Sequence, residues 1–213
     1  MDMDSIKKTG TTTVGLVCKD GVILAADKRA TAGSMVVAKK TDKIQLITDK
    51  IAVTTAGTVS DIQLLIRIVR AQLKLEELRK GSEPKVKESA NFMASLVYNN
   101  IRKMSMIPGI AHFLFAGVDK EGVKLYDIFP DGSLSEIDDY VSSGSGSVFA
   151  YGVLEAGYKH NLSVEEGTVL AVKSINAAMQ RDTASGQGID VIAITKDGVK
   201  KVFNKMVDYS VKV

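Results

Sequence analysis

Beyond its first ten residues the chain changes from polar, aperiodic sequence to segments with the composition of β-strands. Residues 11–18 and 22–27 are rich in threonine, valine, isoleucine and leucine, and the turn Lys19-Asp20-Gly21 separates them. Two such runs around an Asp-Gly pair predict a β-hairpin. The second run is apolar at both alternating sets of positions, which indicates a sheet covered on each face. A loop containing Thr31-Ala32-Gly33-Ser34 and short strands at residues 35–37, 43–46 and 51–56 are predicted to follow.

Two helices are predicted after these strands. Ser60 has the Ser-x-x-Gln spacing of a capping box with Gln63, so we expect it to begin the first helix. This helix is expected to end near Lys80-Gly81. Its apolar positions are widely spread, so we expect it to be covered on more than one side, in part by another subunit. A second helix is predicted over residues 86–103, before Pro108-Gly109 breaks the chain.

The second half of the chain returns to strands, then helices, then strands. Residues 142–147 are all serine or glycine, and we interpret them as a loop that leads into a helix rather than a linker between domains. The whole order, without βαβ alternation, predicts an α+β fold with two helices on each side of stacked antiparallel sheets. The predicted elements are strands at residues 111–118, 123–129 and 134–140, helices at residues 148–158 and from a Ser163–Glu166 capping box to about Asp182, and a hairpin of residues 189–195 with 199–203.

Composition narrows the class of protein. Of the 213 residues, 45% are hydrophobic and 25% are charged, which is ordinary for a soluble globular domain with a sizeable core. The net charge is only +3 and no basic run with interleaved aromatic residues occurs, so nucleic-acid binding is a weak alternative. No apolar run reaches the roughly 20 residues that cross a membrane. The polar N-terminus lacks the apolar segment of a secretory signal, and we expect a cytoplasmic protein.

Cysteine and histidine are scarce. Cys18 is the only cysteine, which excludes an internal disulfide and favours a reducing compartment. Because Cys18 lies within apolar strand sequence, we interpret it as a buried structural thiol rather than a nucleophile. His112 also lies in an apolar strand run and is interpreted as a core or edge residue, and His160 is the only other histidine. We therefore expect no metal site, and the chemistry considered next needs no organic cofactor.

The junction Gly10-Thr11-Thr12-Thr13 carries the main chemical hypothesis. In the simplest interpretation it is only the start of a strand. If the bond between Gly10 and Thr11 is cut, however, Thr11 carries a hydroxyl and a free α-amine on one residue. Such an amine can activate the hydroxyl as a nucleophile.

Asp27 and Lys43 are candidates to tune this amine. Asp27 ends an apolar strand, and Lys43 lies on the polar face of a short strand whose other face includes Leu46 and is expected to join the core. A lysine in a strand is most simply a surface residue. In a cleft, its charge would lower the pKa of the Thr11 amine, which would then accept the hydroxyl proton, and Asp27 would hold the lysine in place.

Three further segments contain polar groups or donors. Arg181-Asp182-Thr183-Ala184-Ser185-Gly186 follows a helix, and the loop around Ser145 is rich in glycine. Each is most simply a helix end or a loop. Gly57 ends a strand just before a helix, so its backbone N–H lies near the positive end of the helix dipole and suits an oxyanion donor.

Together these segments resemble the β subunits of the proteasome core particle, most closely the archaeal type, over nearly the whole chain. Each motif is weak alone, but all of them in this order are highly specific. The matching motifs are Gly10-Thr11-Thr12-Thr13-Val14-Gly15, Asp27-Lys28-Arg29-Ala30-Thr31, Lys43, Thr55-Ala56-Gly57, Gly144-Ser145-Gly146-Ser147 with Tyr151-Gly152, and Arg181-Asp182-x-x-Ser185-Gly186.

The resemblance implies the N-terminal-nucleophile hydrolase fold, a four-layer αββα sandwich of two antiparallel sheets between helix layers. It also implies that residues 1–10 are a removable propeptide and residues 11–213 a single catalytic domain. After autocatalytic cleavage of the Gly10–Thr11 bond, Thr11 would be the nucleophile of a threonine endopeptidase. The other implied catalytic positions are Lys43 with its partner Asp27, a polar network of Ser145, Asp182 and Ser185 around the Thr11 amine, and the Gly57 amide as oxyanion donor.

Substrate contacts are implied by the same resemblance. The backbones at Thr31 and Gly57 would bind the substrate as an added β-strand. The side chain before the scissile bond would enter a pocket lined by Ala30, Thr41, Gln45, Thr55 and Val59. Because none of these residues is charged and Ala30 leaves space, a neutral or apolar side chain is expected there.

The implied partners are proteasome α subunits and other β subunits in stacked seven-membered rings, an ATPase ring that acts through the α ring, and unfolded polypeptide as substrate. Three alternatives remain. Intact Thr11, Lys43 and Asp27 argue against a catalytically silent β subunit with a structural role. A proteasome α subunit would carry an extended N-terminal helix in place of a removable leader. A different N-terminal-nucleophile amidase, acting on small molecules, is disfavoured by the motifs around Ser145 and Asp182.

Overall fold

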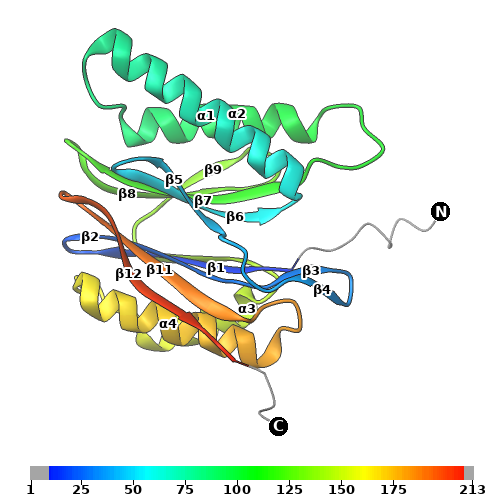
Figure 1. The fold of residues 1–213 in the computed structure, drawn as a ribbon. Coiled ribbons are helices and arrows are strands. Elements are labelled where there is room, and N and C mark those ends of the chain that lie inside the picture. The colour runs from blue at the N-terminus through cyan, green and yellow to red at the C-terminus, as the bar shows by residue number, and fades with distance from the viewer. Residues whose placement is uncertain (1–9, 209–213) are drawn as a thin grey trace.

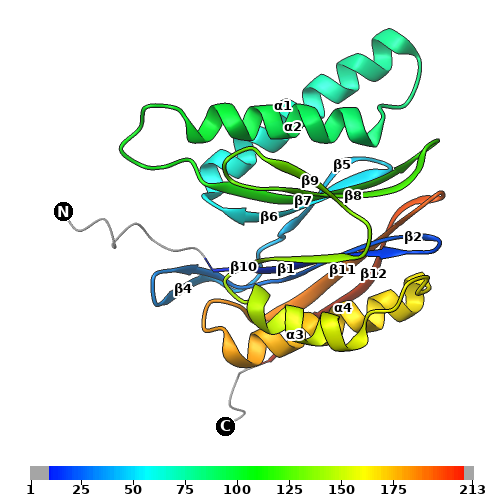
Figure 2. The same ribbon diagram turned by 180° about the vertical axis from the view of Figure 1, so that it is seen from behind.

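Two stacked β-sheets lie between two layers of helices in the computed structural model, which describes residues 10–208 (Figures 1 and 2). Residues 1–9 of the expected propeptide lie outside this range. The strands are β1 (Thr12–Cys18), β2 (Gly21–Asp27), β3 (Ala30–Ala32), β4 (Met35–Ala38), β5 (Ile44–Thr48), β6 (Ile51–Gly57), β7 (Ala111–Asp119), β8 (Gly122–Ile128), β9 (Leu134–Ile137), β10 (Tyr140–Gly144), β11 (Gly188–Thr195) and β12 (Gly198–Met206). The helices are α1 (Val59–Lys80), α2 (Val86–Ile101), α3 (Ser147–Gly157) and α4 (Val164–Arg181).

The two large sheets are antiparallel, and each has a pair of helices on its outer face. Sheet I has the strand order β10-β1-β2-β11-β12, and sheet II has the order β5-β6-β7-β8-β9. Helices α3 and α4 cover sheet I, whereas α1 and α2 cover sheet II (Figure 1). A small hairpin of β3 and β4 stands apart from both sheets. The predicted α+β class and four-layer arrangement are therefore confirmed.

Three apolar clusters hold the four layers together, and β2 shows how one strand serves two of them. Successive side chains of a strand point to opposite faces. Ile23 and Ala25 join the cluster between sheet I and its helices, whereas Val22 and Leu24 join the cluster between the two sheets. Every residue of β2 is buried, as the apolar run predicted. The third cluster fills the space between sheet II and its helices.

The helix ends agree with the sequence in part. The capping box at the start of α4 is present, with the Ser163 hydroxyl accepting from the Glu166 amide and the Glu166 carboxylate accepting from the Ser163 amide. The box expected at Ser60 is wrong. Helix α1 begins earlier, at Val59 after Thr58, and the Ser60 hydroxyl donates to Asp61 instead. The Thr58 amide donates a hydrogen bond of 2.7 Å to the Ile110 carbonyl, which does not belong to the helix. This contact with a distant segment determines where α1 begins.

One face of α1 is buried, and its remaining apolar residues are exposed within the described chain. The buried face consists of Ile62, Leu65, Ile66, Val69 and Leu73. Leu64, Ile68 and Leu75 are 38–48% exposed. We expected α1 to be covered on more than one side, but residues 10–208 cover only this one face.

Three predictions of local structure are wrong in the segments that connect the two sheets. The single strand expected over residues 134–140 is two strands, because the chain leaves sheet II after β9 and enters sheet I as β10. Ile137 packs in the cluster between the sheets, whereas Tyr140 packs against the helix side of sheet I. Ser142 and Ser143 consequently belong to a strand, and the expected loop is confined to the residues around Ser145. The segment expected as a loop at Thr31 forms β3, which pairs with β4.

The expected faces of the strand at Lys43 are wrong in part. Ile44 packs against the cluster between the sheets, as expected. Leu46, placed on the core face, is 51% exposed, whereas Lys43 is only 4% exposed. A lysine at this position is therefore not a surface residue. The reason lies in its partner, because the buried carboxylate of Asp27 holds its ammonium group.

The environment of Cys18 leads to a test of the core. The residue is 4% exposed, and burial, followed by the charges of Asp20, Glu166 and Glu165, raises the pKa of its thiol to about 12. Since the thiolate is the reactive form, we expect iodoacetamide at pH 8 to leave Cys18 unmodified in the folded protein. Mass spectrometry should detect modification only after denaturation in guanidinium chloride. Rapid labelling of the folded protein would contradict this burial.

Candidate active site

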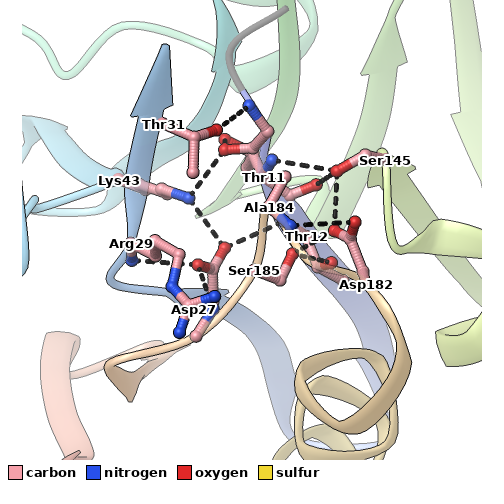
Figure 3. A network of polar contacts seen from close by, with 12 residues as sticks. Thr11, Thr12, Asp27, Arg29, Thr31, Lys43, Ser145, Asp182, Ala184 and Ser185 are labelled. Atoms are coloured by element: carbon pink, nitrogen blue, oxygen red, sulfur yellow. Dashed lines mark hydrogen bonds and ion pairs between the residues drawn. The ribbon is translucent and has the colours of Figure 1, made fainter. Parts of the chain in front are cut away.

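The start of β1 lies between two other strands of sheet I, and this position determines what surrounds Thr11. Thr12 pairs with Gly144 of β10, and Thr13 pairs with Ala26 of β2. Thr11 is therefore close to the end of β10 on one side and to the end of β2 on the other. It is 5% exposed, and its amide donates to the Ser145 hydroxyl at 3.3 Å (Figure 3).

The residue before Thr11 is held just as closely. The Gly10 amide donates to the Thr31 hydroxyl at 3.0 Å, and the Gly10 carbonyl accepts from the Thr11 hydroxyl at 2.7 Å and from the Lys43 ammonium at 3.3 Å. A Cβ atom on Gly10 would lie 1.7 Å from the Cβ atom of Ala184, so only glycine fits here. The Gly10–Thr11 peptide bond thus lies within reach of the Thr11 hydroxyl and of a cationic donor.

Asp27 is the buried centre of the site. Its side chain is 0% exposed and accepts from the Lys43 ammonium at 2.7 Å and from the Thr12 amide at 2.9 Å through Oδ1. Its other oxygen, Oδ2, accepts from the amides of Arg29 at 3.0 Å and Gly186 at 2.9 Å. Asp27 therefore joins β1, β2, Lys43 and the loop after α4 through a single carboxylate (Figure 3).

Burial and charge act in opposite directions on Lys43. Desolvation lowers the pKa of its ammonium group, and the Asp27 carboxylate, which favours the charged form, offsets this in part. The net direction is a lowered pKa. When the ammonium is paired with Asp27, its charge lies in low-dielectric surroundings and acts strongly on neighbouring atoms.

A second polar network lies on the other side of Thr11. The Ser145 hydroxyl donates to Asp182 Oδ2 at 2.7 Å, so it can accept from the Thr11 amide. Ser185 also donates to Asp182 Oδ2, at 2.6 Å, and shares a 2.7 Å hydrogen bond with the Thr12 hydroxyl. Asp182 is the C-cap residue directly after α4, which fixes its carboxylate relative to sheet I.

The loop that carries Ser145 depends on a glycine beside Thr11. Gly144 has φ = +93°, a conformation that L side chains rarely adopt. A Cβ atom there would lie 2.0 Å from the Thr11 carbonyl oxygen. The close approach of β10 to β1 at this point therefore requires glycine.

The proposed specificity residues separate into two groups. Thr41, Gln45, Thr55 and Val59 line one pocket of about 290 Å³. Ala30 and Thr31 lie instead in β3, where the Thr31 hydroxyl anchors Gly10. Gly57 ends β6 two residues before the first residue of α1, as predicted. The structure thus gathers Thr11, Asp27, Lys43, Ser145, Asp182 and Ser185 into one connected network.

Sequence reasoning missed several residues of this region. Helix α1 adds Ile62, Gln63, Ile66, Arg67 and Arg70 to the pocket wall. Arg70 donates to the Gln45 side-chain oxygen at 3.2 Å and to the Leu46 carbonyl at 2.6 Å, so it orients Gln45. The spacing of three to four residues on one helix face was the available signal.

Arg29 was missed as well. Its guanidinium donates to the Thr183 carbonyl at 2.9 Å and occupies the space beside Gly186, where a Cβ atom would lie 2.5 Å from Nη2. It therefore supports the loop that carries Ser185. No local sequence signal distinguishes this arginine from a surface residue.

Among residues 10–208 no group of three or more histidine, cysteine or acidic side chains is placed to hold a metal ion. In the same range no helix has the length and apolar composition needed to cross a membrane.

Comparison with known proteins places this chain in a family. The family profile described as "Proteasome subunit" matches residues 7–194. The chain belongs to the proteasome subunit family.

Archaeal members of the family are close in sequence. The chain is 49% identical to the proteasome subunit beta of Ferroglobus placidus over 187 residues, covering 88% of this chain and 87% of the relative. It is 47% identical to that of Archaeoglobus profundus, covering 93% and 91%, and 44% identical to that of Methanocaldococcus jannaschii, covering 93% and 86%. The resemblance inferred from the motifs is therefore confirmed, together with the proteasome family fold.

The buried ion pair of this proteasome subunit leads to a stability prediction. Asp27→Asn would leave the Lys43 ammonium in the interior without its carboxylate, at a cost of about 3 kcal/mol or more. We expect a melting temperature lower by roughly 6–12 °C, measured at a fixed protein concentration. The control is Glu77→Gln, which removes the exposed Lys74–Glu77 pair and should shift the melting temperature by less than about 3 °C. Equal shifts in the two variants would contradict the central role of Asp27.

Proposed function

We propose that this chain is a catalytic β subunit of the proteasome core particle, a threonine endopeptidase that hydrolyses peptide bonds of unfolded proteins. The observation that carries the proposal is the position of Thr11. Its hydroxyl contacts the Gly10 carbonyl, its nitrogen contacts Ser145, and the Lys43 ammonium lies on the same carbonyl oxygen. Membership of the proteasome family and the similarity to archaeal β subunits support the same function.

The first proposed reaction is removal of residues 1–10 from the domain of residues 11–213. The Thr11 hydroxyl oxygen attacks the Gly10 carbonyl carbon, and the negative charge that develops on the carbonyl oxygen is stabilised by Lys43, 3.3 Å away. The bond between the Gly10 carbonyl carbon and the Thr11 nitrogen breaks, and the Thr11 nitrogen takes the proton that the hydroxyl loses. Gly10 is left as an ester on the Thr11 side-chain oxygen. Water then hydrolyses the ester, which releases the propeptide and leaves Thr11 with a free α-amine.

Peptide hydrolysis follows the same chemistry with the new amine as base. The amine takes the proton of the Thr11 hydroxyl while the oxygen attacks the substrate carbonyl, and the amine later gives the proton to the leaving nitrogen. Lys43 favours the neutral, basic form of the amine through its positive charge. Ser145, which contacts the Thr11 nitrogen, and its partner Asp182 orient the amine. The Gly57 amide is the proposed oxyanion donor, and water completes the cycle by hydrolysing the acyl-enzyme.

Substrate binding is proposed to use backbone and pocket together. The backbones at Thr31 and Gly57 pair with an extended substrate as an added strand. The side chain before the scissile bond enters the pocket lined by Thr41, Gln45, Thr55 and Val59, near Ala30. The wall also contains Asp42 and Arg67, whose charges are of opposite sign, and Arg70 is already engaged with Gln45 and with a backbone carbonyl, so a neutral side chain remains the proposed preference.

Assembly and location complete the proposal. The subunit would function in the cytoplasm, in stacked seven-membered rings with α subunits and other β subunits, and an ATPase ring would deliver unfolded polypeptide through the α ring. The alternative, a catalytically silent β subunit of the same barrel, is disfavoured by the intact network of Thr11, Lys43 and Asp27.

Maturation can be tested by mass. We expect intact-mass spectrometry of the protein assembled with α subunits to show a chain that begins at Thr11, because the nucleophile and the Gly10 carbonyl are already in contact. The matched variant Thr11→Ala lacks the attacking oxygen and should retain Met1–Gly10. An active particle that keeps these ten residues would refute cleavage at this bond.

The role of Lys43 can be tested by activity. We expect Lys43→Ala to lower kcat for peptide hydrolysis at least about a hundredfold, because a preorganised charge beside the reacting atoms is lost. Lys50→Ala, which removes an exposed ion pair with Glu83, serves as the matched control and should leave kcat unchanged. The kcat of both variants is measured with a fluorogenic peptide on assembled particles. Near-normal turnover of Lys43→Ala would remove Lys43 from the mechanism.

A further inference from the structure

His112 joins the two sheets through a chain of three side chains that lies outside the network around Asp27. Its Nε2 atom is 2.6 Å from Asp127 Oδ1, and its Nδ1 atom is 2.9 Å from the Ser143 hydroxyl. His112 and Asp127 belong to β7 and β8 of sheet II, whereas Ser143 belongs to β10 of sheet I. Sequence analysis identified His112 only as a core or edge residue.

All three groups are largely removed from solvent. Ser143 is 3% exposed and Asp127 is 4% exposed, and the His112 side chain is 17% exposed. The ring of Phe129 stacks on the imidazole, with centroids 5.0 Å apart and planes at 29°, which restricts its rotation. Because a carboxylate only accepts hydrogen bonds, Nε2 donates to Asp127, and in the neutral ring Nδ1 accepts from the Ser143 hydroxyl. Both imidazole nitrogens, Asp127 Oδ1 and the Ser143 hydroxyl thus have a partner, as burial requires.

The same three residue types occur in serine hydrolases, but the geometry does not suit a second nucleophile. The Ser143 hydroxyl is enclosed between the sheets, where no substrate carbonyl can approach it. A chain of this kind is instead a rigid polar connection, because each bond fixes the orientation of the next group.

The strands that carry His112 and Ser143 lead to two different parts of the proposed site. On β7, His112 pairs with Ala56 of β6, the residue just before Gly57. On β10, Ser143 pairs with Thr13 of β1 and is followed by Gly144 and Ser145, the residue that contacts the Thr11 nitrogen. The connection therefore ties the strand end that leads to Gly57 to the strand end that leads to Ser145. Figure 2 shows these two sheets facing each other, with β10 at the edge of sheet I.

We infer that Ser143, His112 and Asp127 form an inter-sheet clamp, and that His112 and Ser143 are positioning residues for the Ser145 loop and the Gly57 strand end. This inference rests on the proposed function of Thr11, because it assigns the clamp the task of holding the two sides of that site at a fixed separation. Loss of the clamp would misplace groups that act on the transition state, whereas the pocket wall formed by Thr41, Gln45 and α1 keeps its own contacts. A small displacement of such groups reduces kcat strongly.

The test compares clamp variants with controls of the same chemistry. Ser143→Ala removes the hydroxyl that links β10 to His112, and His112→Gln replaces the rigid ring stacked on Phe129 with a flexible amide. Ser174→Ala is the matched serine control, because Ser174 is fully buried and bonds only to the Leu170 carbonyl within α4. His160→Gln is the histidine control, because His160 is exposed and far along the chain in the α3–α4 connection.

Two measurements are made on assembled particles. We expect Ser143→Ala and His112→Gln to lower kcat for a fluorogenic peptide about tenfold with KM changed less than about twofold, while both controls match the unmodified chain. Hydrogen exchange of the peptide covering residues 140–147 should be about tenfold faster in the clamp variants only. The double variant should lose no more kcat than His112→Gln alone, because both changes break one chain.

The outcomes separate this inference from the proposed function. If the unmodified particle hydrolyses the peptide and the clamp variants match it in kcat and in exchange, the clamp is overturned and the proposed function stands. A rise in KM at constant kcat would also overturn it. If the unmodified particle is inert, the proposed function fails, and exchange of residues 140–147 alone decides the clamp: acceleration supports it, and equality with Ser174→Ala overturns it.

Discussion

The carboxylate of Asp27 is the constraint on which the rest of the site depends. It is completely buried, and a buried charge is tolerated only when partners satisfy it. Its four donors come from Thr12, Lys43, Arg29 and Gly186, which belong to segments far apart in the sequence. Each donor must be in place at once, because losing one leaves a buried polar group without a partner. The start of β1, the Lys43 ammonium and the loop after α4 therefore take up their positions together.

The four-layer architecture makes this burial possible. Sheet I supplies Asp27 and the start of β1 as neighbouring strand ends, and Asp182 directly follows its helix α4, close to the same strands. Sheet II supplies Lys43 from the segment just before β5, and its carbonyl accepts from the Thr55 amide at 2.9 Å. The site thus lies where the two sheets meet at one end. The two sheets together therefore bring the Lys43 cation, the polar network of Asp182 and the start of β1 to one place.

Much of the fold was predictable because its elements follow local rules. The hairpins around Asp-Gly turns, the capping box at Ser163 and the doubly apolar β2 all depend on patterns within a few residues. The predictions of element boundaries that proved wrong share a different cause. Residues 134–140 show no break where the chain crosses from one sheet to the other, and Thr58 rather than Ser60 precedes α1 because a carbonyl at Ile110 accepts its amide. These boundaries are set by contacts between segments that are distant in sequence.

The amino-acid sequence by itself determined the α+β class, the family and the residues that meet at Thr11, because these are recorded in periodicity and in short motifs of fixed order. Only the tertiary structure decided that Lys43 is buried rather than exposed, that Arg29 and Arg70 support the site, and that His112 connects the two sheets. The physical reason is that burial, ion pairing and hydrogen bonding are properties of pairs of residues. A lysine or histidine has the same local sequence signal whether its partner is water or a carboxylate from another strand, and only the folded chain shows which one it meets.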